Sequence, residues 1–309
     1  MRIDTINREI RSDKIKYFLS YEGIKTEVLY FEGVIKHREK LNIRDDIEFI
    51  PLLRNHSFLG WSNPLKAYER TKFCIDNLKD EKRNISALMS SIVEYCFYKS
   101  PEFSKRGDAS RLYDTLVDLM KSDYSLSKKE NISFYDNRVD DITSCISDYF
   151  LNNYSIKNVD KFIKTQFISF NPDKDKVCLI VDRDKKSLNK KQYYQLLRKC
   201  SESNYKLYIS NPCFEFWLLL HFNEVFDIDK KLIEDNMKMM DIVNPPHFTE
   251  TELIKLLPEY EKNNICFKEL KERISLALKN EKAFSESLLD LEGNIGSNVG
   301  LLIKELLSV

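Results

Sequence analysis

A short apolar run that ends in two carboxylates is the feature that most constrains this chain. Residues 177–181, Val-Cys-Leu-Ile-Val, lead directly into Asp182, Arg183 and Asp184. A β-branched run of this length bounded by charge predicts a strand buried on both faces, as in a parallel sheet. Asp182 and Asp184 would then stand at the carboxyl end of the strand, which is the edge where open α/β sheets bind ligands.

The two aspartates are spaced to act together. Residues two apart at a strand end point the same way, and carboxylates are the hard oxygen ligands that Mg²⁺ or Mn²⁺ takes. We therefore expect Asp182 and Asp184 to form half of a metal site. The alternative is a solvated turn without a ligand, because a DxD motif alone is a weak signal.

The beginning of the chain repeats this design. Residues 15–21 read as a strand, Glu22 stands at its tip, and Gly23 permits a tight turn before a helix that opens at Thr26. A parallel sheet would bring Glu22 to the same edge as the aspartate pair. Glu22 is therefore the third expected metal ligand.

These motifs resemble those of a known fold. A strand that ends in Glu-Gly and a later strand that ends in Asp-x-Asp resemble the Toprim domain, the metal-binding fold of topoisomerases, primases and OLD-type nucleases. Residues 21–27, 181–184 and above all 210–222 resemble the RloB/AbiLii-like proteins of bacterial phage-defence loci. The resemblance covers residues 14–78 and 174–309 and leaves out the middle of the chain.

The expected architecture is α/β, a Toprim-like parallel sheet flanked by helices. Its core is split between residues 14–79 and 174–225. Residues 80–173 show apolar spacings of three and four, which predict a mainly helical insert, and residues 226–309 predict a helical C-terminal region. The expected C-terminal helices cover residues 249–257, 266–280, 282–291 and 299–307. Within the insert, the expected helical stretches cover residues 86–98, 110–121 and 142–168.

Two further patterns have simple explanations. The insert is rich in aromatic residues, which we expect to form its own small core, although a surface for stacking single-stranded bases is the alternative. The glycines at 293, 296 and 300 lack the GK[ST] ending of a phosphate-binding loop, so we expect a connecting turn there.

Other candidate site residues follow the expected strand over residues 206–210. Glu215 lies in the first turn of an apolar helix, on the same side as the aspartate pair, and we favour it as a metal ligand. The alternative is that Glu215 only complements the helix dipole. We expect Glu27, Asn211 and His221 to support the ligands, although a lone histidine on an apolar helix is usually a hydrogen-bonded core residue.

The charge distribution leaves room for a nucleic-acid site. The chain carries 49 basic and 49 acidic residues, so a high net charge does not argue for nucleic acid, but residues 174–206 hold a basic excess. From this stretch we select four contacts to nucleic acid, with a solvated helix face as the alternative: Arg183, Lys185, Lys186 and Lys190. By the resemblance, Lys25 contacts phosphate after the Glu-Gly turn, and its alternative is an exposed lysine at a helix start.

The constellation favours hydrolysis of phosphodiesters. Nothing here resembles the tyrosine domain of topoisomerases, and the 7 cysteines have no CxxC spacing for the zinc module of primases. The leading hypothesis is a Mg²⁺- or Mn²⁺-dependent nuclease acting on DNA or RNA as an effector of anti-phage defence, with catalytic residues Glu22, Lys25, Asp182 and Asp184. The alternative is a non-catalytic Toprim-like subunit that regulates or binds an AAA/ABC-type ATPase from the same locus. A DxD nucleotide-sugar transferase is disfavoured because it does not call for Glu22.

The expected setting is cytoplasmic. No apolar run approaches the roughly 18 residues that a membrane helix needs, and residues 1–14 are polar and charged. The seven scattered cysteines read as reduced core residues. The sequence leaves open whether the protein forms a homo-oligomer.

Overall fold

The computed structural model describes residues 14–23, 25–52, 63–78, 82–99, 106–133, 136–156, 159–238 and 245–307. The chain divides into two compact units. The first unit comprises Met1–Phe49, Ser62–Tyr68 and Lys176–Val309, and the second comprises Ile50–Trp61 and Glu69–Asp175.

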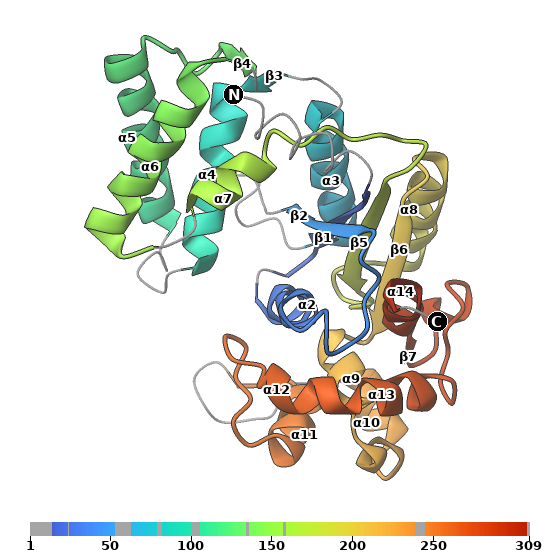
Figure 1. Ribbon diagram of the computed structural model, residues 1–309. Coiled ribbons are helices and arrows are strands. Elements are labelled where there is room, and N and C mark those ends of the chain that lie inside the picture. The colour runs from blue at the N-terminus through green and yellow to red at the C-terminus, as the bar shows by residue number, and fades with distance from the viewer. Residues whose placement is uncertain are drawn as a thin grey trace. The chain divides into compact units, whose positions relative to one another are not determined.

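The elements follow one another as labelled in Figure 1. The strands are β1 (Ile15–Tyr21), β2 (Ile47–Leu52), β3 (Lys82–Asn84), β4 (Asn131–Ser133), β5 (Lys176–Asp182), β6 (Lys206–Asn211) and β7 (Gly296–Ser297). The α-helices are α2 (Thr26–Lys36), α3 (Pro64–Leu78), α4 (Ile85–Lys99), α5 (Arg106–Tyr124), α6 (Arg138–Tyr154), α7 (Val159–Thr165), α8 (Lys190–Glu202), α9 (Phe214–Leu219), α10 (Lys230–Asp235), α11 (Phe248–Leu256), α12 (Phe267–Leu270), α13 (Ile274–Glu281) and α14 (Val299–Leu306). Short 3₁₀ turns cover Asn223–Phe226, Lys271–Arg273 and Asp290–Glu292. Among the helices of the described residues, none combines the length and the apolar character needed to cross a membrane.

A five-stranded sheet organises the first unit. Its strand order is β2-β1-β5-β6-β7, and β1, β5 and β6 run parallel to one another. Tyr21 of β1 pairs with Ile180 of β5, and Asp182 of β5 pairs with Ser210 of β6. The carboxyl ends of all three strands therefore meet at one edge. The expected α/β class is confirmed, and this mostly parallel sheet with flanking helices is consistent with a Toprim-like arrangement.

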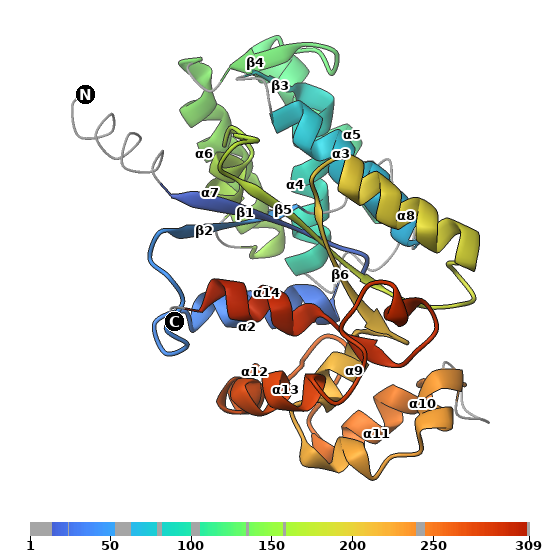
Figure 2. The same cartoon turned by 90° about the vertical axis from the view of Figure 1, so that its right-hand side faces the viewer.

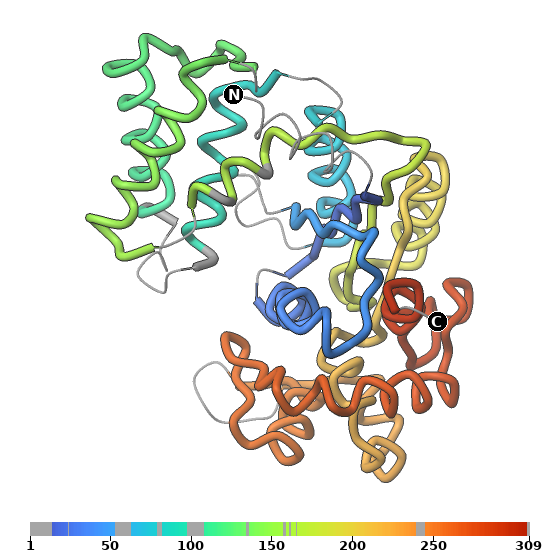
Figure 3. Tube along the Cα trace, in the orientation of Figure 1, coloured from blue at the N-terminus to red at the C-terminus, as the bar shows by residue number. Residues whose placement is uncertain are grey.

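The central strands are apolar because both of their faces are covered. Residues 177–181 of β5 are all buried, as a parallel sheet between helices requires. Helix α8 covers one face of the sheet, and α2 and α14 cover the other (Figure 2). Figure 3 lets the reader follow the crossover from β5 through α8 to β6. Asn189 starts α8 with a capping box, in which its side chain accepts from the Gln192 N–H and the Gln192 side chain accepts from the Asn189 N–H.

The end of the chain differs from the sequence prediction. The helix predicted over residues 282–291 is wrong, because only a 3₁₀ turn forms at its end. The glycine-rich stretch is not merely a turn either, since Gly296 and Ser297 pair with β6 as the antiparallel strand β7. A Cβ at Gly296 would collide with the backbone of Ser285. Tertiary pairing with β6 thus decides this segment, and local periodicity cannot show it.

The second unit has a helical core of its own. Helices α4, α5, α6 and α7 bury a contiguous apolar cluster that includes Met89, Leu116 and Phe150. Tyr95 stacks on Phe162 with ring centroids 4.4 Å apart, so aromatic residues of this unit pack on its own core. The antiparallel pair β3–β4 was not predicted.

One predicted helix of this unit is two helices. The stretch over residues 142–168 is divided between α6 and α7. Helix α6 ends where Ser155 adopts a left-handed conformation with φ 53°. A left-handed residue at the helix end stops the helix regardless of the apolar spacing that continues beyond it.

Candidate metal centre

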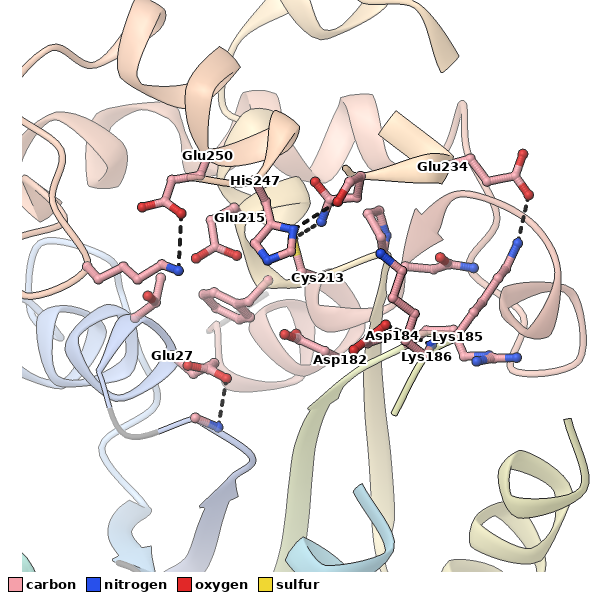
Figure 4. Close-up of a pocket in the computed structure, with 18 of the residues that line it drawn as sticks. Glu27, Asp182, Asp184, Lys185, Lys186, Cys213, Glu215, Glu234, His247 and Glu250 are labelled. Atoms are coloured by element: carbon pink, nitrogen blue, oxygen red, sulfur yellow. Dashed lines mark hydrogen bonds and ion pairs between the residues drawn. The ribbon is translucent and has the colours of Figure 1, made fainter. Parts of the chain in front are cut away.

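A cavity of about 560 Å³ opens at the carboxyl edge of the sheet. The loops after β1, β5 and β6 supply one part of its lining, and residues between 234 and 262 supply another. In Figure 4, Glu27 and Glu215 lie on one side of Asp182, and Lys185 and Glu234 lie on its other side. The cavity therefore lies at the edge of the sheet where the sequence predicts a site, and residues beyond the predicted ones also line it.

Glu22 and Asp182 are direct neighbours. The Glu22 N–H donates to the Ile180 carbonyl at 2.9 Å, which extends the β1–β5 ladder by one residue. The Asp182 N–H in turn donates to Glu22 Oε2 at 3.0 Å. Glu22 is only 9% exposed, so its carboxylate is held against the end of β5.

Asp182 is a strongly perturbed carboxyl group of the cavity. The residue as a whole is half-buried, yet its Oδ1 is buried and has no hydrogen-bond partner within the described residues. Burial raises the pKa of Asp182 well above its ordinary value, and the carboxylates of Glu27, Glu22 and Glu215 raise it further. Leaving a buried acceptor unpaired costs about 1–3 kcal/mol. A cation would relieve both the missing partner and the repulsion.

Glu27 contributes more to this cluster than the sequence suggested. It is 5% exposed, and the Gly23 N–H donates to its Oε1 at 3.0 Å. A Cβ at Gly23 would overlap the Glu27 carboxylate, so only glycine allows this close approach. Among the carboxylates that raise the pKa of Asp182, Glu27 acts most strongly. We therefore treat Glu27 as a candidate ligand rather than as a supporting residue.

Asp184 has a different environment from Asp182. It lines the cavity but is exposed, and its Oδ1 accepts from the Lys186 N–H at 2.9 Å. Its carbonyl oxygen accepts from the Leu188 N–H at 2.9 Å. Asp184 thus shapes the turn that follows β5, and it is not among the principal carboxylates that perturb Asp182. The two aspartates do not form the symmetric pair that their spacing predicts.

Glu215 faces the cavity from α9 and has a partner from the C-terminal region. The Tyr260 hydroxyl donates to Glu215 Oε1 at 3.1 Å. Lys262 Nζ lies 3.1 Å from Glu250 Oε2. Burial alone would lower the pKa of Lys262, but the negative charges of Glu215 and Glu250 outweigh burial and raise it. Glu215 therefore does more than complement the dipole of α9.

Two of the predicted basic contacts lie beside Glu292 of the protein itself, Arg183 buried and Lys190 exposed. Arg183 is 2% exposed and donates to the Glu292 carbonyl at 3.1 Å and to the Leu188 carbonyl at 2.6 Å. Lys190 Nζ, which does not line the cavity, lies 3.5 Å from Glu292 Oε2. The interpretation of Arg183 as a nucleic-acid contact was wrong in physical terms, because its buried guanidinium already has internal acceptors.

The remaining lysines lie at the cavity. Lys185 Nζ donates to Glu234 Oε1 at 2.7 Å and to the Gly293 carbonyl at 3.3 Å. Lys25 and Lys186 line the cavity and are exposed. Their positions suit contacts to a nucleic-acid phosphate backbone that runs beside the carboxylates.

His221 belongs to the core and not to the cavity. It is fully buried, its Nδ1 donates to the Trp217 carbonyl at 3.1 Å, and the Tyr30 hydroxyl lies 3.2 Å from its Nε2. Burial lowers the pKa of His221 to about 4, so its imidazole is neutral near pH 7. The core role that we weighed for this histidine is the one the structure supports.

A comparison with protein families identifies the chain. The family model described as RloB-like protein matches residues 17–306. The chain belongs to the RloB-like family. The match includes the region between 79 and 173, which the sequence resemblance had left out. Searches of the curated proteins and of the solved structures found no match.

The sequence reasoning missed several residues of the RloB-like cavity. Cys213 Sγ lies 3.2 Å from Thr249 Oγ1, and Asn236 Nδ2 donates to the same sulfur at 3.6 Å. Burial, with the charges of Glu215 and Asp182, raises the pKa of the Cys213 thiol well above its ordinary value. This thiol is protonated and therefore a poor nucleophile. Of the cavity residues that were missed, only His247 could have been suspected from the sequence, because a histidine in the turn before α11 is a common site residue.

His247 is the only histidine that lines the cavity in the described part of this RloB-like chain. Its Nδ1 donates to the Asn236 carbonyl at 2.8 Å. This hydrogen bond fixes the tautomer and leaves Nε2 as an acceptor.

The cavity has the donor types that a hard divalent cation needs. Within the described residues, no group of three or more His, Cys, Asp and Glu side chains lies close enough together to hold a metal ion. Each carboxylate instead has its own hydrogen bond: Glu22 with the Asp182 N–H, Glu27 with the Gly23 N–H, and Glu215 with Tyr260. The unpaired Asp182 Oδ1 and the purely oxygen-based acidic set fit Mg²⁺ or Mn²⁺.

Proposed function

We propose that this RloB-like protein is a metal-dependent nuclease that hydrolyses phosphodiester bonds of DNA or RNA as an effector of bacterial anti-phage defence. The observation that carries the proposal is Asp182, whose buried Oδ1 has no partner in the described residues and whose pKa is raised by burial and three neighbouring carboxylates. Perturbed carboxyl groups that converge in a cavity are a mark of functional sites.

Each residue has a physical role in this proposal. Asp182, Glu22, Glu27 and Glu215 would hold Mg²⁺ or Mn²⁺. In such a site the cation supplies polarisation of a phosphoryl oxygen and a lower pKa for an attacking water. Asp184 is exposed at the cavity, and its Oδ1 accepts from the N–H of Lys186 in the turn after β5.

The phosphates of the substrate also need cationic side chains of the protein to neutralise them. Lys25 and Lys186 lie on the cavity wall and are exposed. They would neutralise the phosphates on either side of the scissile bond, while Lys185 stays paired with Glu234. Positioning of this kind supplies much of the catalysis of phosphoryl transfer.

The second candidate function is a non-catalytic subunit that regulates an AAA/ABC-type ATPase encoded at the same locus. The observation that favours it is that no group of three or more His, Cys, Asp and Glu side chains in the described residues lies close enough together to hold a metal ion. In that case the carboxylates of Glu27, Asp182 and Glu215 would bind a basic segment of the partner. A cytoplasmic location fits either function.

One set of incubations separates the two functions. The purified chain is incubated with Mg²⁺ or Mn²⁺ and, in parallel, with plasmid DNA, single-stranded DNA and tRNA, both alone and with the ATPase. The nuclease proposal predicts cleavage that EDTA stops. No cleavage of any substrate under any of these conditions, together with a stable complex with the ATPase, would establish the regulatory function instead.

A further inference from the structure

A lysine of the C-terminal region reaches the cavity beside Glu215. Lys262 lines the cavity, and its Nζ lies 3.1 Å from Glu250 Oε2. We infer that the Lys262 ammonium group binds a phosphate of the substrate on the Glu215 side of the carboxylate cluster. The inference rests on the proposed nuclease function and adds to it a phosphate contact from a part of the chain where the sequence predicts no site residue.

A short, anchored turn carries Lys262. Glu261 and Asn264 exchange both backbone hydrogen bonds, each at 2.8 Å, so Lys262 is one of the two residues at the tip of a tight hairpin. The residues that flank this hairpin, Tyr260 and Ile265, are each 3% exposed. The turn is therefore fixed on the protein at both of its ends.

Glu215 links this turn to the carboxylate cluster. The hydroxyl of Tyr260, which directly precedes the hairpin, donates to Glu215 Oε1 at 3.1 Å. Glu215 is also among the carboxylates that, together with burial, raise the pKa of Asp182. In Figure 4, Glu215 and Glu250 lie on the same side of Asp182, and the dashed line from Glu250 marks its ion pair with Lys262. The ammonium group of Lys262 therefore lies on the Glu215 side of the cluster.

Lys262 stays cationic and keeps donors for a ligand. Burial alone would lower its pKa, but the negative charges of Glu215 and Glu250 outweigh burial and raise it, so the side chain is protonated at neutral pH. An ammonium group has three N–H donors, and the ion pair with Glu250 needs only one of them. The Lys262 side chain is 50% exposed, so a substrate can reach the others.

The supporting residue predicted at the end of β6 has no such donors left. The Nδ2 of Asn211 donates to the Leu291 carbonyl at 2.9 Å and to the Asn294 carbonyl at 2.8 Å. An amide nitrogen has only two hydrogens, so both are used within the protein. Asn211 ties the end of β6 to the 291–294 segment, whereas Lys262 can donate to a phosphate.

A cation at this position suits the substrate because its surroundings are acidic. The carboxylates of Glu27, Asp182 and Glu215 repel a phosphate backbone, and one divalent cation offsets only part of their charge. An ammonium group beside Glu215 offsets more of it and gives a phosphate oxygen a charge-assisted hydrogen bond. A lysine that stays protonated also stabilises negative charge that develops on the phosphate during cleavage.

The test measures binding of two labelled phosphorothioate oligonucleotides, one DNA and one RNA, to the full chain in Mn²⁺. Phosphorothioate linkages keep the charge of a phosphodiester and resist hydrolysis, so fluorescence anisotropy at several salt concentrations gives the affinity without cleavage. Lys262→Met removes the charge and keeps the length of the side chain, whereas Lys262→Arg keeps the charge.

Lys255→Met is the matched control. Lys255 also pairs with a glutamate, since its Nζ lies 2.6 Å from Glu252 Oε1, but Lys255 does not line the cavity. Ion pairs with an exposed lysine contribute little to stability, so all three variants should fold.

We expect Lys262→Met to weaken binding and to reduce the slope of log K against log salt by about 0.7, the contribution of one phosphate contact on a single strand. Lys262→Arg should keep most of the wild-type slope, and Lys255→Met should keep all of it. Equal slopes for wild type and Lys262→Met would overturn the inference and leave the nuclease proposal standing.

Titration of Mn²⁺ without nucleic acid separates a phosphate contact from a mere counter-ion of Glu215. If Lys262→Met binds Mn²⁺ more tightly than wild type and keeps the wild-type salt slope, Lys262 only neutralises Glu215 and the inference is wrong. If the wild-type chain binds neither oligonucleotide in Mn²⁺, the nuclease proposal and this inference fail together.

Discussion

The Asp182 N–H donates to Glu22 Oε2 at 3.0 Å, so the carboxylate that ends β1 is bound to the backbone of the strand end beside it. This contact keeps Glu22 next to Asp182 even without a cation. The Asp182 carboxyl group is thereby held near a negative charge, and its raised pKa follows from burial and from that charge together with Glu27 and Glu215.

Asp182→Asn should stabilise the protein in the absence of metal. Below the ordinary pKa of an aspartate, about 4, Asp182 is protonated in both the folded and the unfolded state. As the pH rises toward the raised folded pKa, only the unfolded state ionises, so stability is lost. We expect a gain of about 1–3 kcal/mol for the variant near neutral pH, measured by urea unfolding in EDTA at pH 5 and pH 8.

The gain should be larger at pH 8 than at pH 5. Mg²⁺ should then stabilise the wild-type chain and have little effect on Asp182→Asn, because the variant lacks a ligand. A variant that is less stable than wild type at both pH values would show that the Asp182 charge is already compensated within the protein.

Glu27→Gln should weaken cation binding more than Asp184→Asn. Glu27 is buried and perturbs Asp182 strongly, whereas Asp184 is exposed and bonded to the Lys186 N–H. We expect a loss of about tenfold or more in Mn²⁺ affinity for Glu27→Gln and a much smaller loss for Asp184→Asn. Titration calorimetry of both variants measures this difference, and the reverse order would restore the Asp-x-Asp pair as the main ligands.

Much of this arrangement could be predicted from the sequence, since its causes are local. An apolar run that meets charge marks a strand end, and parallel strands bring their carboxyl ends together. Glu22, Asp182 and Glu215 were located by this reasoning. The capping of α8 by Asn189 is equally local.

The rest depends on contacts between distant parts of the chain. The sequence predicts Arg183 as a nucleic-acid contact because it cannot show that its partner is Glu292, more than one hundred residues away. The strong effect of Glu27 on the pKa of Asp182 comes from burial and from the close approach of Gly23 to the Glu27 carboxylate. The failed helix over residues 282–291 has the same origin, because hydrogen bonds to β6 at residues 296–298 fix where the segment lies.

Lys186→Ala should weaken nucleic-acid binding and reduce its salt dependence. Lys186 is exposed on the cavity wall, and a lysine that contacts one phosphate contributes about 1 to the slope of log K against log salt. Lys191→Ala is the matched control, since Lys191 is exposed on α8 and does not line the cavity. Fluorescence anisotropy with a labelled oligonucleotide in EDTA, at several salt concentrations, gives both slopes. Equal slopes for the two variants would remove Lys186 from the phosphate path.

Glu281→Gln should flatten the pH dependence of stability. Glu281 is fully buried, its Oε1 accepts from the Gly300 N–H at 2.7 Å, and Lys304 Nζ lies 3.6 Å from its Oε2, too far for a hydrogen bond. Burial raises the pKa of Glu281 to about 8. Stability from the protonated carboxyl is therefore complete below about pH 4.5 and is lost as the pH rises through 8.

Glutamine keeps the acceptor for Gly300 and cannot ionise. We expect it to reduce the loss of stability between pH 5 and pH 9 by roughly 2–5 kcal/mol, as measured by chemical unfolding across that range. Glu202→Gln is the control, because Glu202 is exposed on α8 beside Arg198 and is not among the groups that shift the pKa of Glu281. Parallel pH profiles for wild type and Glu281→Gln would show that Glu281 is ionised in the folded protein.

The most direct measurement compares cleavage of nucleic acid by the wild-type chain and by Asp182→Asn, in Mn²⁺, on whichever substrate the incubations identify. The substitution is nearly isosteric and removes the charge at the centre of the carboxylate cluster. The account predicts metal-dependent cleavage by wild type and only background cleavage by a folded Asp182→Asn variant that still binds the substrate. Cleavage by Asp182→Asn at the wild-type rate would contradict the claim that this cluster is the catalytic metal site.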